Sequence, residues 1–263
     1  MERITSRTNP VVKEFRGAAA RSGTLLLLDG AHLLDEALAC GVRVEVVALE
    51  ERFADGAPGS LARRAAAAGA RVLLVSAAVL DAMSPVRTPS GVVALARRPD
   101  VTLNDALETV PQLLLVLAGV QDPGNVGAIV RAGDACGATG IVAGEGSADP
   151  FGWKALRGSM GSVFHLPVVT APLGEIAGAS RQRRVRLVAT VPRGGTPLPE
   201  CDLRGPVAVL LGGEGGGIPD AILSLADAHV TIPMVRPVES LNVATAAAIL
   251  TYEAMRQRQE TTA

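Results

Sequence analysis

Apolar and polar residues alternate along this chain in a way that predicts strands and helices in regular succession. Short runs rich in Val, Leu and Ile are separated by stretches in which apolar residues recur at helical spacing. Before residue 100 the expected strands are Thr24–Leu28, Val44–Leu49, Arg71–Val75 and Gly91–Ala96, and the expected helices are Ala31–Cys40, Ser60–Ala68 and Ala77–Met83. This alternation predicts an α/β protein built from parallel βα units.

A polar stretch interrupts the alternation after Ala96. It begins with Arg97-Arg98-Pro99-Asp100 and ends at Pro111, which is typical of a linker between domains. We therefore expect two domains, 1–104 and 105–263. The second has expected strands at Gln112–Ala118, Gly140–Val142, Val163–Leu166, Arg186–Val191, Val207–Leu211 and Val230–Ile232, and expected helices at Val126–Cys136, Pro219–Ala226 and Val243–Gln259. These strand residues suit a sheet that is covered on both faces.

Composition narrows the possible functions. The 263 residues include 25 basic and 26 acidic side chains, so any attraction to nucleic acid must come from a local surface. No apolar run approaches the roughly 20 residues that span a bilayer, and the first residues do not open a signal peptide, so we expect a cytoplasmic protein with no membrane partner. Aromatic residues make up 2% of the chain, which argues against single-strand binders that stack bases on aromatic rings.

Cysteine and histidine residues give no pattern of a metal site or a disulfide framework. Neither a CxxC pair nor an HxxxH pair occurs among Cys40, Cys136, Cys201, His32, His165 and His229. We therefore expect no bound metal.

Three segments of the second domain place Gly, Asn or Ser just beyond an expected strand, where an α/β sheet opens its binding crevice. The first runs from Gly119 to Arg131 and contains the turn Asp122-Pro123-Gly124-Asn125. Asn125 and Arg131 lie within two helical turns, so both can face the end of the sheet. The simpler interpretation is that Asn125 caps the helix and Arg131 is solvated.

The second segment is the glycine loop, Leu211–Pro219, which holds five glycines around a single carboxylate, Glu214. Glycine is tolerated where the backbone turns sharply or approaches a ligand closely, and a flexible loop is the simpler alternative. No GK[ST] follows and the match to GxGxxG is poor, which disfavours a nucleoside triphosphate site.

The third segment, Ile232–Val243, leads into the last helix, which either Ser240 or Asn242 can cap.

Together the three segments resemble the motifs of one enzyme family. The matching pieces are Asn125-x-Gly127-x-Ile129-x-Arg131, Gly213-Glu214 with Gly217-Ile218-Pro219, and Ile232-Pro233-Met234 leading to Ser240-Leu241-Asn242-Val243. In order and spacing they resemble the SpoU or TrmH branch of the SPOUT RNA methyltransferases. The first domain resembles the L30e-like substrate-binding domain of this family at Ile4-Thr5-Ser6, Asn9-Pro10, Asp29-Gly30 and Pro89–Ala94.

The resemblance implies methyl transfer from S-adenosylmethionine (AdoMet) to a ribose 2′-hydroxyl of structured RNA, without a metal. It also implies a SPOUT domain with a deep C-terminal trefoil knot, and a homodimer formed through the last helix and the Asn125 helix. The L30e-like domain favours 23S ribosomal RNA over transfer RNA, in either a housekeeping or an antibiotic-resistance role. A non-catalytic RNA-binding relative is the alternative within this fold.

Roles for individual residues also follow from the resemblance. The motif arginine, Arg131, would clamp a phosphate and position the hydroxyl, since guanidinium normally stays protonated. A deprotonated Arg131 that acts as the base is the alternative. Asn125 would orient Arg131 or the ribose. The pocket around the substrate would be shaped by Glu214, Ser240 and Asn242. The cofactor would be held, largely by backbone, at Gly212, Gly213, Ile232 and Leu241, with Thr190 beside them.

RNA attachment requires local positive charge. The expected RNA-binding residues are Arg3, Arg7, Lys13, Arg16 and Arg21, and a second cluster comprises Arg181, Arg183, Arg184, Arg186 and Arg193. For both clusters a solvated basic face is the simpler alternative.

A Rossmann-type NAD enzyme needs an acidic residue about 20 residues beyond its glycines. Asp227 and Glu239 lie 15 and 27 residues beyond Gly212, which disfavours that enzyme class.

Overall fold

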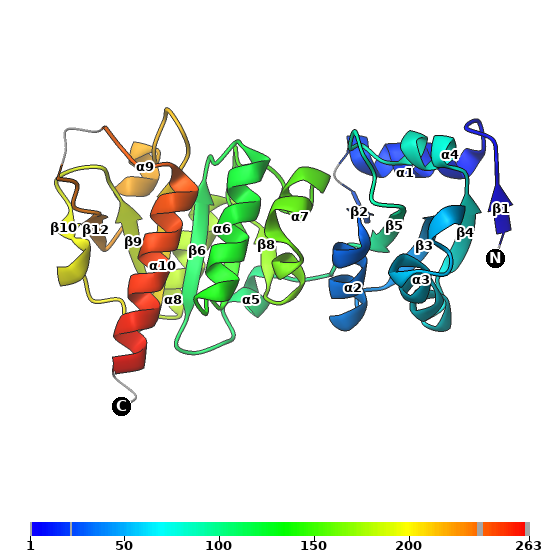
Figure 1. Cartoon of the computed structure of the whole chain (residues 1–263). Helices are drawn as coiled ribbons and strands as arrows, with labels where there is room; N and C mark the ends of the chain where they lie inside the picture. The colour runs from blue at the N-terminus through cyan, green and yellow to red at the C-terminus, as the bar shows by residue number, and fades with distance from the viewer. Residues whose placement is uncertain (1, 22, 236–238, 261–263) are drawn as a thin grey trace. The chain divides into compact units, whose positions relative to one another are not determined.

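The computed structural model describes residues 2–21, 23–235 and 239–260, and the chain divides into two compact units, each with its own sheet (Figure 1). The first unit comprises Met1–Asp100 together with Phe151–Phe164. The second comprises Val101–Pro150 and His165–Ala263. Within the described residues, no helix is both long enough and apolar enough to cross a membrane.

The first unit contains a five-stranded mixed sheet. Its strands are β1 (Glu2–Ile4), β2 (Leu25–Asp29), β3 (Val44–Glu50), β4 (Arg71–Val75) and β5 (Val92–Arg97), in the order β1-β4-β3-β5-β2. β1, β4 and β3 are parallel, whereas β5 runs antiparallel to both β3 and β2. The expectation of a wholly parallel sheet was therefore wrong here, because hydrophobic spacing identifies a strand but not the direction in which the chain enters it.

Helices of the first unit pack on this sheet: α1 (Pro10–Ala20), α2 (Ala31–Ala39), α3 (Ala57–Ala67) and α4 (Ala77–Met83). A 3-10 turn, η1 (Glu51–Phe53), follows β3. α1 was not expected from the sequence, although its start carries a clear signal. Asn9 Oδ1 accepts a hydrogen bond from the Val11 amide at 3.0 Å, and Pro10 occupies the first helical position. The helix buries Phe15 against core residues that include Leu73 and Leu95.

The segment Phe151–Phe164 belongs to the first unit although it comes late in the sequence. It contains α7 (Trp153–Ser159) and η2 (Ser162–Phe164), and α7 packs on β2. The prediction of a strand at Val163–Leu166 was wrong. That stretch starts in η2, and β8 begins only at Val168. Positive φ angles at Met160 and Gly161 turn the backbone just before η2, which an extended strand would not allow.

The second unit contains a seven-stranded sheet that is parallel throughout, as the sequence predicted. Its order is β10-β12-β9-β11-β6-β7-β8, formed by β6 (Leu113–Ala118), β7 (Gly140–Ala143), β8 (Val168–Thr170), β9 (Arg186–Thr190), β10 (Thr196–Pro197), β11 (Val207–Gly212) and β12 (Ala228–Thr231). β6 and β11 are central and almost wholly buried. Both faces of the sheet are covered, which explains why these strands are nearly continuous runs of Val, Leu and Ala.

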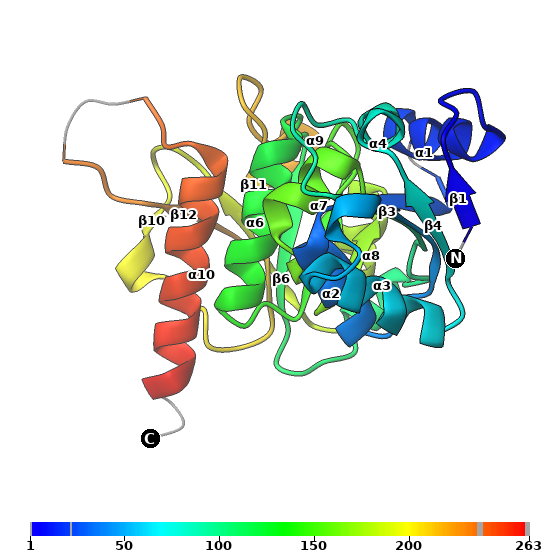
Figure 2. The ribbon, with the colours of Figure 1, turned by 45° about the vertical axis from the view of Figure 1, so that its right-hand side comes forward.

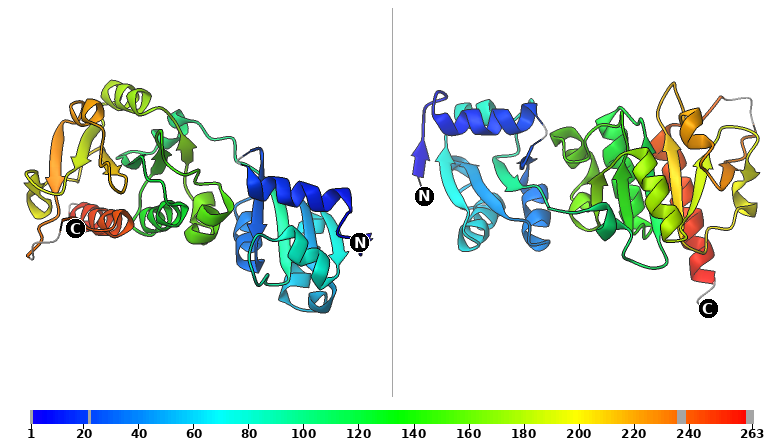
Figure 3. Two further views of the ribbon diagram at one scale, coloured as in Figure 1. Left: turned by 90° about the horizontal axis from the view of Figure 1, so that it is seen from above. Right: turned by 180° about the vertical axis from the view of Figure 1, so that it is seen from behind.

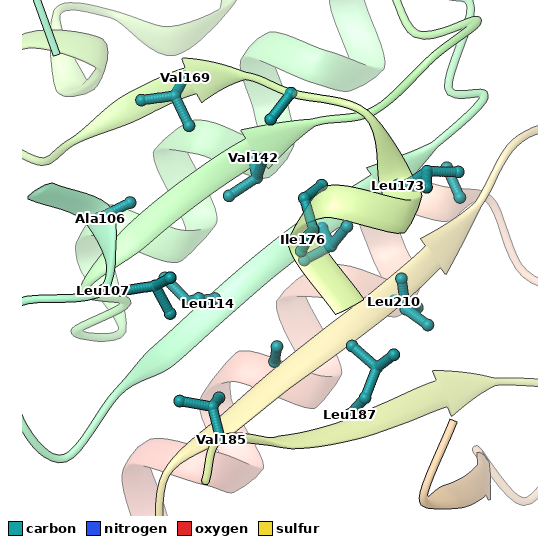
Figure 4. Close-up of a cluster of buried hydrophobic side chains, with 14 of the residues drawn as sticks. Ala106, Leu107, Leu114, Val142, Val169, Leu173, Ile176, Val185, Leu187 and Leu210 are labelled. Atoms are coloured by element: carbon teal, nitrogen blue, oxygen red, sulfur yellow. The ribbon is translucent and has the colours of Figure 1, made fainter. Parts of the chain in front are cut away.

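Helices lie on both faces of this sheet. α6 (Pro123–Ala135) and α10 (Val243–Glu260) pack side by side on one face, as Figures 2 and 3 show. The other face is covered by α5 (Leu103–Ala106), α8 (Leu173–Gln182) and α9 (Asp220–Leu223), and η3 (Leu198–Glu200) follows β10. On that face Leu173 and Ile176 of α8 lie in one buried cluster with strand residues such as Leu114 and Leu210 (Figure 4). This packing brings the carboxyl ends of β6, β9, β11 and β12 to one edge.

Candidate active site

A cavity of about 570 Å³ lies at the carboxyl ends of β9, β11 and β12 in the second unit. Parallel α/β sheets bind ligands at this edge, because the loops that leave the strands converge there. The cavity is lined by Thr190, Val191, Pro192, Leu211, Gly212, Gly213, Glu214, Gly215, Gly217, Val230, Ile232, Met234, Glu239, Ser240, Leu241, Asn242, Val243, Ala246 and Leu250. The lining combines apolar side chains with hydroxyl, amide and carboxylate groups, which suits a small organic ligand with both apolar and polar parts.

The loop between β6 and α6 positions Asn125. Asp122 Oδ1 accepts a hydrogen bond from the Asn125 amide at 2.9 Å, so Asp122 is the cap of α6. The simpler interpretation of Asn125 as the helix cap was therefore wrong. Asn125 is the third residue of the helix, and its side chain is available for other contacts.

Asn125 joins the three sequence segments through its side-chain amide. Its Nδ2 donates to Glu214 Oε1 in the glycine loop, and its Oδ1 accepts from Asn242 Nδ2 at 3.2 Å. We call these two hydrogen bonds the Asn125 bridge. Because Glu214 and Asn242 both line the cavity, the bridge ties two of its walls to the start of α6.

The glycine loop is constrained by the protein's own backbone. A Cβ atom on Gly213 would lie 1.8 Å from the Gly119 carbonyl oxygen, and one on Gly212 would lie 2.7 Å from the Gly217 carbonyl carbon. The Gly213 amide also donates to the Ala118 carbonyl at 2.9 Å. Glycine is therefore required at both positions to pack one loop against another and to close the loop on itself, whatever ligand is bound.

The third segment holds its position through the start of α10. Asn242 Oδ1 accepts hydrogen bonds from the amides of Ala244 at 3.0 Å and Thr245 at 3.2 Å. Asn242 is thus the helix cap, and Ser240 is an exposed residue at the cavity wall. Residues 236–238 of this segment lie outside the described part of the chain.

The residues expected to hold a cofactor all line the cavity: Thr190, Gly212, Gly213, Ile232 and Leu241. The Thr190 hydroxyl donates to the Leu210 carbonyl at 2.9 Å, so it is already engaged with the sheet. The other four bring mainly backbone and apolar surface to the wall.

The structure does not bring Arg131 into the cavity of its own chain. Arg131 is an exposed residue of α6, and its guanidinium has no hydrogen-bond or ion-pair partner among the residues that the structure describes. The remaining expected catalytic residues, Asn125, Glu214, Ser240 and Asn242, gather at the cavity or bind its lining.

The basic residues expected to contact RNA lie in the first unit and differ in their contacts. Arg7 and Arg16 donate through Nε to the carbonyls of Ala78 and Ala82, each at 2.8 Å, and thereby connect α1 and its approach to α4. Arg3 pairs with a carboxylate of η1 at 2.8 Å. The exposed side chains of Lys13 and Arg21 have no such partner in the described structure.

Ser147 is a site-supporting residue that the sequence did not reveal. Its Oγ accepts hydrogen bonds from the amides of Gly119 and Val120 and donates to the Leu117 carbonyl, all at 3.1 Å. It thus holds the backbone against which Gly213 packs. Ser147 lies in an ordinary polar loop, so no local pattern marks it.

Among the described residues, no group of three or more His, Cys, Asp or Glu side chains is placed to hold a metal ion.

Comparison with known proteins matches both parts of the chain. Residues 112–252 match the model of the SpoU rRNA Methylase family, and residues 27–101 match the model for RNA 2′-O ribose methyltransferase substrate binding. The 23S rRNA (guanosine(2553)-2′-O)-methyltransferase RlmP of Bacillus subtilis (strain 168) is 33% identical over 257 residues, covering 96% of this chain and 98% of that protein.

Solved structures agree with the sequence comparisons. The crystal structure of an RNA 2′-O ribose methyltransferase is similar with a TM-score of 0.83 and 36% identity, covering 98% of this chain and 99% of that one. The SpoU methyltransferase AviRb from Streptomyces viridochromogenes, in complex with the cofactor AdoMet, has a TM-score of 0.86 and 27% identity, covering 96% of this chain and all (100%) of that one.

Proposed function

Because this chain belongs to the SpoU rRNA methylase family and is therefore an AdoMet-dependent RNA methyltransferase, we propose that it methylates a ribose 2′-hydroxyl of 23S ribosomal RNA. The observation that carries the proposal is the Asn125 bridge, which draws three motif segments around one cavity. The 23S rRNA substrate is supported by RlmP, which matches both domains of this chain from end to end. Such a substrate implies a cytoplasmic location for the reaction.

The cavity would hold AdoMet, which supplies an activated methyl group on a sulfonium. Its volume lies in the range of small-molecule sites. Gly212, Ile232 and Leu241 would contact the cofactor mainly through their backbones. Gly212 can offer only its backbone to the cofactor, because a Cβ on it would clash with the backbone of Gly217.

The residues of this chain would orient the ribose hydroxyl toward the methyl group. An in-line displacement requires the attacking hydroxyl to be held in line with the methyl group. Asn125 has a fixed orientation because both ends of its amide are hydrogen-bonded, so it can position Glu214 and Asn242 in the cavity lining. Ser240 offers a further hydroxyl to the substrate or cofactor.

Arg131 would act from the second subunit of a homodimer. Its exposed position on α6, away from the cavity of its own chain, supports this arrangement. The neighbouring helix α10 exposes Ile249 by 37% and Tyr252 by 58%, which gives the α6 and α10 surface apolar area to bury. A guanidinium in such an interface would clamp an RNA phosphate and steer the 2′-hydroxyl.

The two domains would have separate roles, RNA binding and catalysis. Residues 1–104 would form the L30e-like domain that binds RNA, and residues 105–263 would form the catalytic SPOUT domain with its C-terminal trefoil knot. The match of residues 27–101 to a substrate-binding model supports the first assignment. Arg3, Arg7, Lys13, Arg16 and Arg21 would supply its phosphate contacts.

The decisive assay measures transfer of labelled methyl from AdoMet to separated rRNA and tRNA from cells lacking this gene, with the product mapped as 2′-O-methyl ribose. Label at a single 23S rRNA site is expected. Label only in tRNA would replace the substrate, and no label from an enzyme that binds AdoMet would favour the non-catalytic relative. Arg131→Ala should abolish transfer while AdoMet affinity stays within about threefold, less than 1 kcal/mol.

A further inference from the structure

A second cavity of the catalytic unit lies at the opposite edge of the sheet from the AdoMet cavity. It has a volume of about 360 Å³ and sits at the amino ends of β9 and β12, beside the end of α8. We call it the arginine pocket; it is lined by Ala177, Ser180, Arg181, Arg184, Val185, Arg186, Leu187, Leu225 and Asp227. Three of the five clustered arginines noted in the sequence therefore meet in one cavity.

The arginine pocket has an excess of positive charge. Arg186 donates to the Asp202 carbonyl, whereas the guanidiniums of Arg181 and Arg184 have no partner among the residues that the structure describes. The one carboxylate, Asp227, accepts a hydrogen bond from the Leu187 amide at 2.7 Å, so it is fixed by the sheet edge. The charge of Arg186 also acts on the nearby Asp202 carboxylate, so the excess comes from Arg181 and Arg184. These two guanidiniums favour an anion, because a guanidinium can bind two phosphate oxygens at once.

A buried hydroxyl provides an independent sign of a ligand. Ser180 is only 1% exposed, yet its Oγ has no hydrogen-bond partner in the described structure. Unpaired buried hydroxyls are rare, because such a group gives up its water without a replacement. A phosphate oxygen in the pocket would supply the missing partner.

Arg184 stands at a backbone position where glycine would be easier. Val185 N donates to the Ser180 carbonyl at 2.9 Å and Arg184 N to the Arg181 carbonyl at 3.2 Å, which is the Schellman ending of a helix. Arg184 occupies the left-handed position of this motif, with a φ of 57°, where glycine is usual. The guanidinium is thus held beside the pocket despite an unfavourable backbone conformation.

We propose that the arginine pocket binds a backbone phosphate of the substrate RNA, outside the nucleotide that is methylated. This inference rests on the RNA substrate of the proposed function. No aromatic side chain lines the pocket, so it offers no surface for stacking a base and suits the phosphate alone. β9 runs from Arg186 at this pocket to Thr190 at the AdoMet cavity, a separation of about 13 Å. The contact therefore positions RNA at a distance from the reacting ribose.

The test is the salt dependence of binding to a 23S rRNA transcript, measured without AdoMet. For the double variant Arg181→Ala/Arg184→Ala, the slope of log K against log salt should decrease in magnitude by about 0.7 to 0.9 for each lost contact. Arg183→Ala is the matched control, because it removes the same charge from the same run but its guanidinium is held by Asn104 at 3.0 Å, outside the pocket. Equal changes in slope in the single variants Arg183→Ala and Arg184→Ala would overturn the proposal.

Two further variants separate recognition from folding. Arg184→Gly relieves the left-handed conformation, so its melting temperature should stay the same or rise while RNA binding weakens. Ser180→Ala removes the unpartnered hydroxyl and should likewise weaken RNA binding without lowering the melting temperature. RNA binding unchanged in both variants would contradict the pocket.

Free phosphate is the other source of the same chemistry. If inorganic phosphate raises the melting temperature of the wild type but not of the double variant, and the RNA slope is unchanged, the pocket takes a free anion and the RNA proposal fails. Methyl transfer distinguishes this result from failure of the proposed function. If the wild type transfers no methyl group to rRNA, yet the double variant shows the slope change, the 23S rRNA substrate fails and the pocket is kept.

Discussion

Asn125→Ala tests whether the Asn125 bridge organises the AdoMet cavity. The variant removes the donor to Glu214 and the acceptor for Asn242, which lie on two walls of the cavity. The α6 backbone and the helix cap Asp122 remain. We therefore expect the glycine loop and the third segment to lose their mutual position without loss of the fold.

The magnitude follows from the two hydrogen bonds. Each contributes about 0.5 to 1.5 kcal/mol net, and the bond to a carboxylate lies at the upper end. Their sum, about 1 to 3 kcal/mol, corresponds to a rise in the Kd for AdoMet of about 5- to 150-fold if the free cavity loses its bound geometry. The rate of methyl transfer at saturating AdoMet should fall as well, because Glu214 and Asn242 both line the cavity.

Isothermal titration calorimetry with AdoMet, together with thermal unfolding, measures both effects. Asp122→Ala is the matched control: it removes the cap of the same helix, at a loss of about 0.5 to 2 kcal/mol in stability, and leaves the bridge intact. We expect Asp122→Ala to lower the melting temperature with little change in AdoMet affinity. If Asn125→Ala binds AdoMet as tightly as the wild type, the bridge does not organise the cavity and the reasoning fails.

Three further predictions concern RNA binding, stability and pH. Lys13→Glu/Arg21→Glu should weaken RNA binding and leave the melting temperature unchanged. Arg7→Glu/Arg16→Glu should lower both RNA affinity and melting temperature, because only this pair donates hydrogen bonds to α4 carbonyls. Equal melting temperatures of the two double variants in a thermal scan would contradict this reasoning. Arg258→Met should lower the free energy of unfolding by about 2 to 4 kcal/mol, measured in urea titrations. The reason is that the half-buried guanidinium donates to four carbonyls at 2.7 to 3.0 Å, those of Leu203, Pro111, Gln112 and Gly205. A loss under about 1 kcal/mol would mean that water replaces these hydrogen bonds. Hydrogen bonding from Arg256 lowers the pKa of Glu253 from 4.5 to about 2, so its contribution to stability is full above pH 4.5 and is lost as the pH falls toward 2. The stability difference between wild type and Glu253→Gln should shrink over that interval in acid unfolding curves, and a constant difference would refute it.

Strands and helices with strong local patterns were predictable from the sequence. β4 and α4 of the first unit have the predicted bounds. The strands of the parallel sheet differ from their predicted bounds by a residue or two, apart from β8 and the short β10. β8 was misplaced because Val163 and Leu166 are apolar neighbours of a turn, and apolar runs of this length do not distinguish a strand from a turn packed on the core. The antiparallel direction of β5 likewise depends on contacts with β2 and β3, which no local pattern contains.

The sequence by itself determined the α/β class, the three motif segments and the family resemblance, because these depend on residue types and short spacings. Only the tertiary structure decided which residues touch. Asn125 meets Glu214 and Asn242 across 89 and 117 residues, Asp122 takes the cap expected of Asn125, and Arg131 remains outside the cavity. The arginine pocket likewise exists only because β9 and β12 pair and bring Asp227 beside Ser180 and Arg184. Side chains far apart in the chain meet only when the sheet has formed, so their hydrogen bonds are properties of packing.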